Sequence, residues 1–139
     1  MPYQLIYTCA LSETVSCDQL ADIAKQSSQR NTERGLTGIL ICKDGSAMQV
    51  LEGDKSVVEQ LYNKIENDAR VKSLLVLIRR NIETREFPDW SMGYRNANKM
   101  DSGFEINTTS LTELLPKNTS PEVRTFTQTF ARVNGCLAS

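Results

Sequence analysis

One stretch of the sequence, ILICKDGSAMQVLEG at residues 39–53, sets a single uncharged amide among apolar neighbours. Its Asp44-Gly45 pair predicts a hairpin, because glycine adopts the positive φ of a two-residue turn without steric cost. The second strand of that hairpin carries Gln49 where a plain core strand would carry Val or Ile. Burying an amide without partners costs on the order of 1–3 kcal/mol. Gln49 therefore either lies on the solvent face of its strand or meets a polar ligand or another side chain.

Two further residues could take part in the same hydrogen-bond chemistry. Tyr7 can give up an electron and then a proton, while a glutamine amide offers an acceptor oxygen and two donor hydrogens that exchange roles by a flip or tautomer change. Asn31 offers both a donor and an acceptor, and it follows Ser27 and Arg30 at the polar end of a predicted helix. Taken alone, Tyr7 is more simply an ordinary core tyrosine, and Asn31 is equally well a helix cap.

Composition disfavours several classes of protein. The 139 residues suffice for one domain that buries about two-thirds of its unfolded surface. A net charge of −1 gives no field that favours nucleic acid or an anionic membrane. The chain has no histidine and no CxxC pair among its cysteines, which disfavours zinc sites and Cys-His or Ser-His mechanisms. No apolar run approaches the roughly 20 residues that span a bilayer, so we expect a cytoplasmic protein with reduced thiols.

The predicted elements alternate between strands and helices. Strands are expected at residues 3–9, on both sides of the hairpin turn, at 74–78 as a buried run, and at 89–95 despite Gly93. Residues 79–85 are expected to be a charged connection or strand edge. One helix begins at the candidate N-caps Ser16 and Asp18 and runs to about residue 31. A second opens at residues 54–56 and ends near 68–70, with an apolar stripe of period near 3.6.

The order of these elements predicts a ferredoxin-like α/β (α+β) sandwich, βαββαββ, with both helices on one sheet face. In that topology the first and third strands are neighbours, so Tyr7 and Gln49 should stand side by side. The chain after residue 96 is more polar, but residues 111–115 and 121–133 have helical spacing. We therefore expect a sandwich domain at residues 1–96 and a helical extension at 97–139 that packs on the other face of the sheet.

Several motifs together resemble the BLUF domain, a blue-light sensor that uses FAD. They are LIYTCAL, SSQRNTERGLTG, MQVLEG, IENDAR and FPDWSMGY, in the family's order and at its usual spacings over about the first hundred residues. Each motif is weak alone, and the combination is specific. The resemblance implies a photoreceptor without catalytic turnover that binds FAD, or alternatively FMN or riboflavin, non-covalently in residues 1–96.

The resemblance also assigns roles by position. Tyr7 is similar to the family's light-driven electron donor and Gln49 to its switching amide. Asn31 matches the residue that hydrogen-bonds the C4 carbonyl and N3 edge of the flavin. Trp90 and Met92 match the pair whose alternative packing near the glutamine carries the signal outward, although two such residues on one strand would ordinarily be core.

Other positions complete the implied flavin site. Arg30 stands where relatives often have Asn or His, and Val71 replaces a histidine that relatives carry after Asp-x-Arg. Asp68 and Arg70 match positions near the ribityl and phosphate groups, and otherwise would be solvated helix-end charges. The resemblance implies no metal. The implied flavin contacts are Tyr7, Ile23, Ser27, Arg30, Asn31, Gln49, Lys64, Asp68 and Arg70.

Two other functions remain open at this point. One is a small ferredoxin-like hydrolase that uses Arg30 and Asn31 on an anionic substrate, such as an acyl phosphate. The other is a ligand-free dimerisation module, in which Gln49 would tolerate Leu. On the photoreceptor interpretation, we expect a homo-oligomer that signals to an unknown effector protein without direct contact with nucleic acid or membrane. The tail helices, on the sheet face opposite the flavin, are the expected output surface.

Overall fold

A two-residue connection joins two inner strands of the sheet. In the computed structural model, which describes residues 2–43, 45–88, 93–96, 115–116 and 119–133, strands β2 (Thr37–Lys43) and β3 (Ser46–Gly53) pair antiparallel. Lys43 lies opposite Ser46, so only residues 44 and 45 separate the two strands. The predicted hairpin is confirmed, although Asp44 itself lies outside the described residues.

The remaining strands complete a five-stranded sheet of order β4-β1-β3-β2-β5. Strand β1 (Tyr3–Leu11) is antiparallel to both β3 and β4 (Val71–Asn81). Strand β5 (Gly93–Asn96) is parallel to β2 at the opposite edge from β4. The ferredoxin-like arrangement is confirmed, including the neighbouring first and third strands. The strand predicted at residues 89–95 is seen only from Gly93, since residues 89–92 lie outside the described part of the chain.

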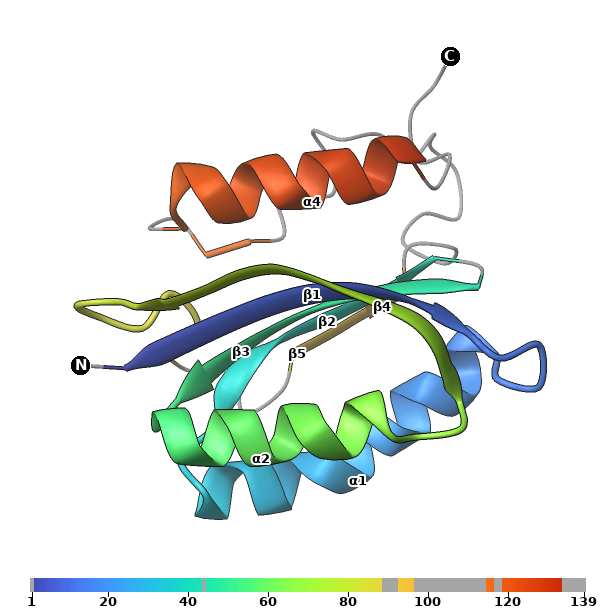
Figure 1. Cartoon of the computed structure of the whole chain (residues 1–139), viewed down its shortest axis with the longest axis horizontal. Helices are drawn as coiled ribbons and strands as arrows, with labels where there is room; N and C mark the ends of the chain where they lie inside the picture. Colours follow the sequence, from blue (N-terminus) through green and yellow to red (C-terminus); the bar gives the residue numbers. More distant parts are fainter. Residues whose placement is uncertain (1, 44, 89–92, 97–114, 117–118, 134–139) are drawn as a thin grey trace.

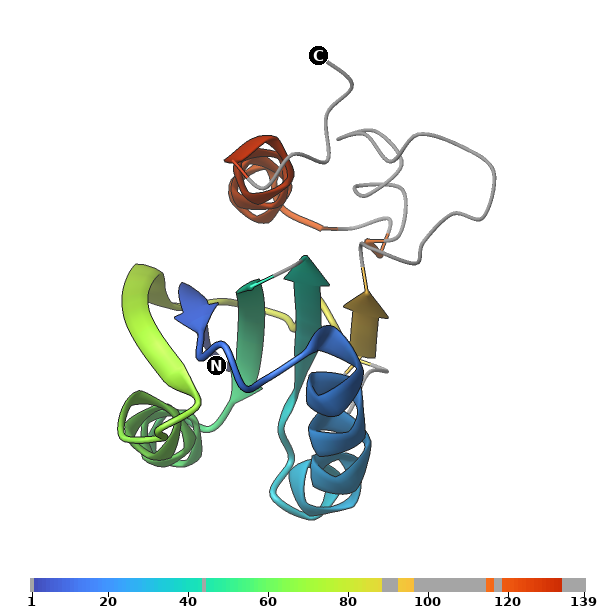
Figure 2. The same cartoon turned by 90° about the vertical axis from the view of Figure 1, so that its right-hand side faces the viewer.

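Helices cover both faces of the sheet. Figures 1 and 2 show α1 (Cys17–Glu33) and α2 (Lys55–Glu66) together on one face and α4 (Pro121–Val133) on the other. A capping box starts α1: the Ser16 hydroxyl accepts from the Gln19 N–H, and the Gln19 side chain accepts from the Ser16 N–H. The helix predicted at 111–115 falls largely on residues 111–114, outside the described residues. Among the described helices, none is long and apolar enough to cross a membrane.

Two glycines fix the path from α1 into β2. Gly35 follows the end of α1 with φ of 70°, in the left-handed region that glycine adopts without cost. A Cβ at Gly38 would lie 1.8 Å from the carbonyl oxygen of Val50, so a side chain there would force β2 away from β3. The sequence GLTG therefore ends the helix and lets the two strands approach.

The central strands are buried on both faces, with a separate apolar core on each side. The core between the sheet and helices α1 and α2 includes Leu5, Tyr7, Leu40, Leu51, Val58 and Tyr62. The core beneath α4 includes Ile6, Ile39, Ile41, Met48, Val50, Val123 and Phe130. Polar side chains of β1 and β3 are therefore removed from bulk water whichever face they occupy.

Strand β4 differs from its prediction in length and burial. It runs over residues 71–81 rather than 74–78, and Leu75 is 63% exposed. The expectation of a buried strand is wrong, because β4 is an edge strand with β1 as its one neighbour. Ile6 pairs with Ile78 while Tyr7 pairs with Val76, so Leu77 is an extra residue in a β-bulge.

The expectation of reduced thiols is also wrong for two cysteines. Cys17 and Cys42 form a disulfide across a Cα–Cα distance of 5.8 Å. They are 25 residues apart in the sequence, a spacing that matches no known cysteine motif. The two cysteines meet because the first turn of α1 packs against β2. Cys9 is a buried free thiol.

Candidate functional site

Tyr7 and Gln49 are direct partners across the β1–β3 pair, as predicted. The Tyr7 hydroxyl donates a hydrogen bond to Oε1 of Gln49, and both residues are buried. Gln49 therefore meets another side chain, and the alternative that it lies on the solvent face is wrong. The ring of Tyr62 packs edge-on against that of Tyr7 with centroids 6.4 Å apart, which limits movement of the phenol.

Both side chains line a cavity of about 290 Å³ on the sheet face that α1 and α2 cover. Its size is near the lower end of ordinary small-molecule pockets, roughly 300–1,000 Å³. The lining is mostly apolar, with side chains such as Leu20, Ile23, Leu40, Leu61 and Ile65. The structure brings together in this one cavity all nine residues that the sequence placed in a flavin site: Tyr7, Ile23, Ser27, Arg30, Asn31, Gln49, Lys64, Asp68 and Arg70.

Asn31 is the buried polar residue that α1 presents to the cavity. Ser27, Arg30 and Asn31 occupy positions i, i+3 and i+4 of the helix and so share one face. Asn31 is not the C-cap of α1, because Arg34 occupies that position. The backbone carbonyl of Asn31 accepts a hydrogen bond from the Leu36 N–H at 2.8 Å. Within the described part of the chain, no hydrogen bond of the Asn31 side-chain amide is found. The Asn31 amide opens onto the cavity instead, where it is accessible to a polar ligand.

Asp68 and Arg70 form an ion pair just beyond α2, with Arg70 Nη2 2.5 Å from Asp68 Oδ2 and Arg70 Nε 2.9 Å from Asp68 Oδ1. The hydrogen bonds from Arg70 lower the pKa of the Asp68 carboxyl. Arg30, Arg34 and Lys64 also line the cavity and are exposed, so cationic groups stand at its mouth. An anionic group of a ligand would be favoured there.

The ionisation of the buried groups limits the chemistry of this site. Burial raises the pKa of Tyr7 well above its ordinary value, so its phenol is a hydrogen-bond donor at neutral pH. Burial also raises the pKa of Cys9 to about 11. The Cys9 thiol on the cavity wall is therefore protonated at neutral pH and a poor nucleophile.

Sequence reasoning missed several wall residues. Arg34 lines the cavity four positions after Arg30, and this helical spacing could have identified it. Leu20 and Leu61 also line the cavity, and the apolar periodicity of the two helices does not distinguish a core position from a ligand wall. Cys9 lies two residues after Tyr7 on the same strand face. Trp90 and Met92 lie outside the described residues.

The residues present fit a flavin. The amides of Gln49 and Asn31 offer both donors and acceptors, as the alternating edge of an isoalloxazine requires. Apolar walls suit its flat aromatic ring, and the cations at the mouth suit phosphate. This fit rests on the donor set and on the buried Asn31 amide.

Comparison with known proteins gives an independent result. A sequence profile of the family described as "Sensors of blue-light using FAD" matches residues 3–93. The chain is 31% identical over 91 residues to the photoactivated adenylate cyclase subunit alpha of Euglena gracilis, which covers 64% of this chain and 9% of that protein. It is 29% identical over 89 residues to the photoactivated adenylate cyclase subunit beta of Euglena longa, covering 63% of this chain and 10% of that protein. The chain thus spans about a tenth of these relatives.

Solved structures of similar fold include chains of comparable length. BlsA in its ground state superposes with a TM-score of 0.69 at 26% identity, over all of this chain and 90% of that one. The dark-state structure of BlrB, a BLUF protein, superposes with a TM-score of 0.69 at 25% identity, over 95% of this chain and 96% of that one. A bacterial light-regulated adenylyl cyclase gives 0.72 at 28% identity, covering 96% of this chain and 34% of that one.

Proposed function

The chain belongs to the BLUF family, the sensors of blue light that use FAD, and from this premise we propose that Tyr7 and Gln49 are the pair that responds to light. As a family member, the protein is a blue-light photoreceptor that binds FAD. The observation that carries the proposal is the hydrogen bond from the Tyr7 hydroxyl to Gln49 Oε1 on the wall of the cavity.

The proposed mechanism needs little movement of the protein. Bound FAD supplies the absorption of blue light and the capacity to accept an electron. Tyr7 gives up an electron and then its phenolic proton, which passes to the side chain that already accepts its hydrogen bond. Gln49 then flips or changes tautomer and presents a different hydrogen-bond pattern to the ring edge. The return of both the electron and the proton restores Tyr7, while the rearranged amide persists until thermal recovery returns the dark state.

Other residues of the cavity hold the cofactor in this proposal. Asn31 and Ser27 bind the polar edge of the flavin ring, with Arg30 beside them. Lys64, Asp68 and Arg70 bind the ribityl and phosphate portion, since cations and a hydrogen-bonded carboxylate complement hydroxyl and phosphate groups. Residues 1–96 form the flavin-binding domain, and Trp90 and Met92 transmit the change at Gln49.

The output is a change in binding rather than catalysis. The BLUF domain is a sensor, and we propose that residues 97–139 pass its state to a separate effector protein or to a second copy of the chain. The packing of α4 against the sheet face opposite the cavity supports this extension as the output surface. The light-regulated cyclases to which the chain is similar have much longer chains than this one.

The cytoplasmic location predicted from the sequence remains part of the proposal. The Cys17–Cys42 disulfide is unusual in a reducing compartment. Both cysteines are buried, however, so thiol reductants have little access to the bond. A buried disulfide is therefore compatible with a cytoplasmic protein.

Absorption spectra of the purified protein, recorded before and after blue light, test the proposed function. A BLUF photoreceptor should be yellow, release its flavin on denaturation, and show a small red shift that reverses in the dark. Chromatography of the released flavin distinguishes FAD from FMN and riboflavin. A colourless protein, or a flavoprotein with no reversible shift, would contradict the proposal.

A further inference from the structure

Strands β1 and β3 carry a polar pair on each face of the sheet. Tyr7 lies opposite Gln49 on the cavity side, and Gln4 lies opposite Glu52 on the side of α4. The two pairs are three residues apart along the strands, about 10 Å. The β1–β3 register is regular from Tyr3 to Ala10, so both pairs belong to one continuous ladder. A change in the geometry of one pair therefore acts on strands that also hold the other.

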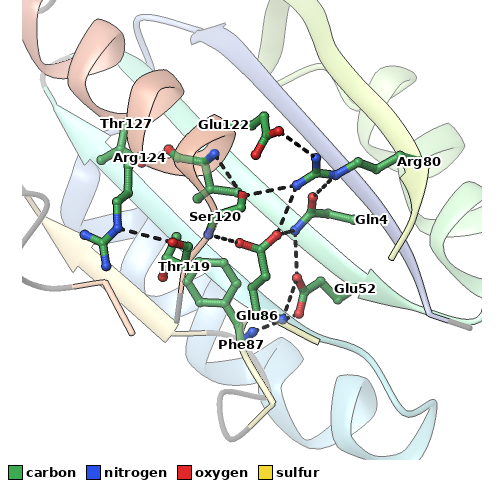
Figure 3. A network of polar contacts seen from close by, with 11 residues as sticks. Gln4, Glu52, Arg80, Glu86, Phe87, Thr119, Ser120, Glu122, Arg124 and Thr127 are labelled. Atoms are coloured by element: carbon green, nitrogen blue, oxygen red, sulfur yellow. Dashed lines mark hydrogen bonds and ion pairs between the residues drawn. The ribbon is translucent and has the colours of Figure 1, made fainter. Parts of the chain in front are cut away.

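The amide of Gln4 is saturated by buried partners. Its Nε2 donates to Glu52 Oε2 at 2.8 Å and to Glu86 Oε2 at 2.7 Å, and its Oε1 accepts from Arg80 Nε at 2.9 Å. Gln4 and Glu52 are 0% exposed. Figure 3 shows Gln4 at the centre of this cluster, between the two carboxylates and the guanidinium. The amide cannot rotate without losing several bonds at once, so it has few intermediate positions.

The same cluster holds the start of α4. Glu86 Oε1 accepts from the backbone N–H of Ser120, and Arg80 Nη2 donates to the Ser120 hydroxyl at 3.1 Å. That hydroxyl also caps the helix by accepting from the Val123 N–H at 3.3 Å. Arg80 makes a further ion pair with Glu122 at 3.6 Å. The N-terminus of α4 is thus bonded to side chains that bond directly to Gln4 (Figure 3).

Burial makes these contacts sensitive to geometry. Glu52 also accepts from the backbone N–H groups of Glu86 and Phe87, at 3.1 and 2.9 Å. Burial raises the pKa of the Glu52 carboxyl, so its ionised form depends on these donors. A small displacement of β1 against β3 would leave a buried polar atom short of a partner, and the cluster would have to rearrange as a unit.

We propose that Gln4 relays a change at the Tyr7–Gln49 pair through the sheet to the N-terminus of α4, with Glu52, Glu86 and Arg80 as its partners. The relay rests on the proposed function, because light is what changes the Tyr7–Gln49 pair. It involves no covalent step. It gives the output helix a second link to the photoactive pair that does not pass through Trp90 and Met92. Gln4 is a positioning residue, since it lies on the sheet face opposite the cavity.

Hydrogen exchange of the full-length, FAD-loaded protein tests the relay. Peptides that cover α4 are compared in the dark and under blue light for the wild type, Gln4→Met and Thr8→Val. Methionine keeps the length of the side chain without its hydrogen bonds. Thr8 is the matched control, because it lies on the same strand and the same face, near Phe126 and Phe130 of α4. The spectral shift is recorded on the same samples.

The relay predicts that blue light changes the hydrogen-exchange rate of α4 in the wild type and in Thr8→Val. In Gln4→Met the exchange rate of α4 should be the same in the dark and in the light, while the spectral shift of the flavin is unchanged. Gln4→Met should also speed exchange of α4 in flavin-free protein kept in the dark. Should Gln4→Met fail to fold, the Arg80→Met/Glu86→Met double variant decides, since it removes both side chains that connect Gln4 to Ser120 and keeps the Gln4–Glu52 bond.

Each contrary result has a distinct meaning. A full light-dependent change in α4 of a folded Gln4→Met or Arg80→Met/Glu86→Met protein would overturn the relay. A wild type that shows the spectral shift without any change in α4 would overturn it as well. A wild type without a spectral shift refutes the proposed function instead. In that case the link between Gln4 and α4 is tested without light. It would be refuted if flavin-free Gln4→Met, kept in the dark, showed the same hydrogen-exchange rate in α4 as the flavin-free wild type.

Discussion

Gln49 lies directly opposite Tyr7 in the β1–β3 ladder and accepts the hydrogen of its phenol. This bond fixes the amide with its oxygen towards Tyr7. Half a turn of the amide would place a donor group against the phenol hydrogen, which is a repulsive contact unless Tyr7 also changes its hydrogen bond. The two side chains must therefore change state together, and neither can switch alone.

Asn31→Ala is expected to weaken flavin binding by about 1–3 kcal/mol, the cost of leaving a buried polar partner unpaired. The protein should stay folded, since no hydrogen bond of the Asn31 amide to the described part of the chain is lost. Titration of flavin into apoprotein measures the effect. Gln29→Ala, an exposed change on the same helix, is the matched control. Equal flavin affinity of the Asn31 variant and the wild type would remove Asn31 from the site.

Loss of the Cys17–Cys42 disulfide should lower the free energy of unfolding by about 3 kcal/mol, because the crosslink restricts a loop of 25 residues in the unfolded chain. Urea unfolding of the wild type and of a Cys17→Ala/Cys42→Ala variant measures the difference. With a strong reductant present, the free energy of unfolding of the wild type should fall close to that of the variant. The free energy of unfolding of the variant should not change.

Alkylation checks that the disulfide exists. In denatured protein without reductant, Cys9 should be modified while Cys17 and Cys42 are protected. Mass spectrometry of the peptides reads the result directly. Modification of both Cys17 and Cys42 without reductant would show that the bond is absent and would restore the expectation of reduced thiols.

Stability should fall at alkaline pH, in part through Cys9. Its pKa is raised from 9.0 to about 11 by burial, so the folded state holds the proton more tightly than the unfolded state. The stabilisation is fully present below about pH 9 and is lost as the pH rises through about 11. A shift of this size corresponds to about 3 kcal/mol at most. Urea unfolding across this pH range should show that the free energy of unfolding falls more steeply with pH for the wild type than for Cys9→Ser. Parallel pH dependences of the two proteins would contradict the contribution of Cys9.

Local chemistry explains which parts of the fold could be predicted from the sequence. Asp44-Gly45 between apolar runs identifies the hairpin, because few other residues tolerate the turn. Once the order of elements indicates a ferredoxin-like sheet, the strands of Tyr7 and Gln49 are neighbours, and the observed register places the two residues opposite each other. The polar end of α1 likewise identifies Ser27, Arg30 and Asn31, since their spacing puts them on one helix face.

Features that depend on packing between distant segments could not be predicted in this way. The exposure of Leu75 follows from the edge position of β4, which an apolar run does not reveal. The sequence also gives no reason to single out Gln4, Glu52 and Glu86, because charged and amide side chains ordinarily face solvent. They become a buried cluster only when the loop at residues 86–87 and the start of α4 meet the sheet.

Tyr7→Phe and Gln49→Leu separate photochemistry from flavin binding. The first removes one hydroxyl and keeps the ring, and the second removes the amide at roughly constant volume. Both variants should remain folded and yellow. Because each side chain depends on the other, the double variant should lose no more of the light-induced red shift than either single variant. This is the non-additivity expected of residues that act as a unit.

The most direct measurement is the light-minus-dark absorption spectrum of flavin-loaded Tyr7→Phe, recorded beside the wild type at equal flavin content. If Tyr7 supplies the electron and the proton that rearrange Gln49, the wild type should show a reversible red shift and the variant should lose it. A Tyr7→Phe protein with the full reversible shift would contradict the mechanism, even though the protein would still be a flavoprotein.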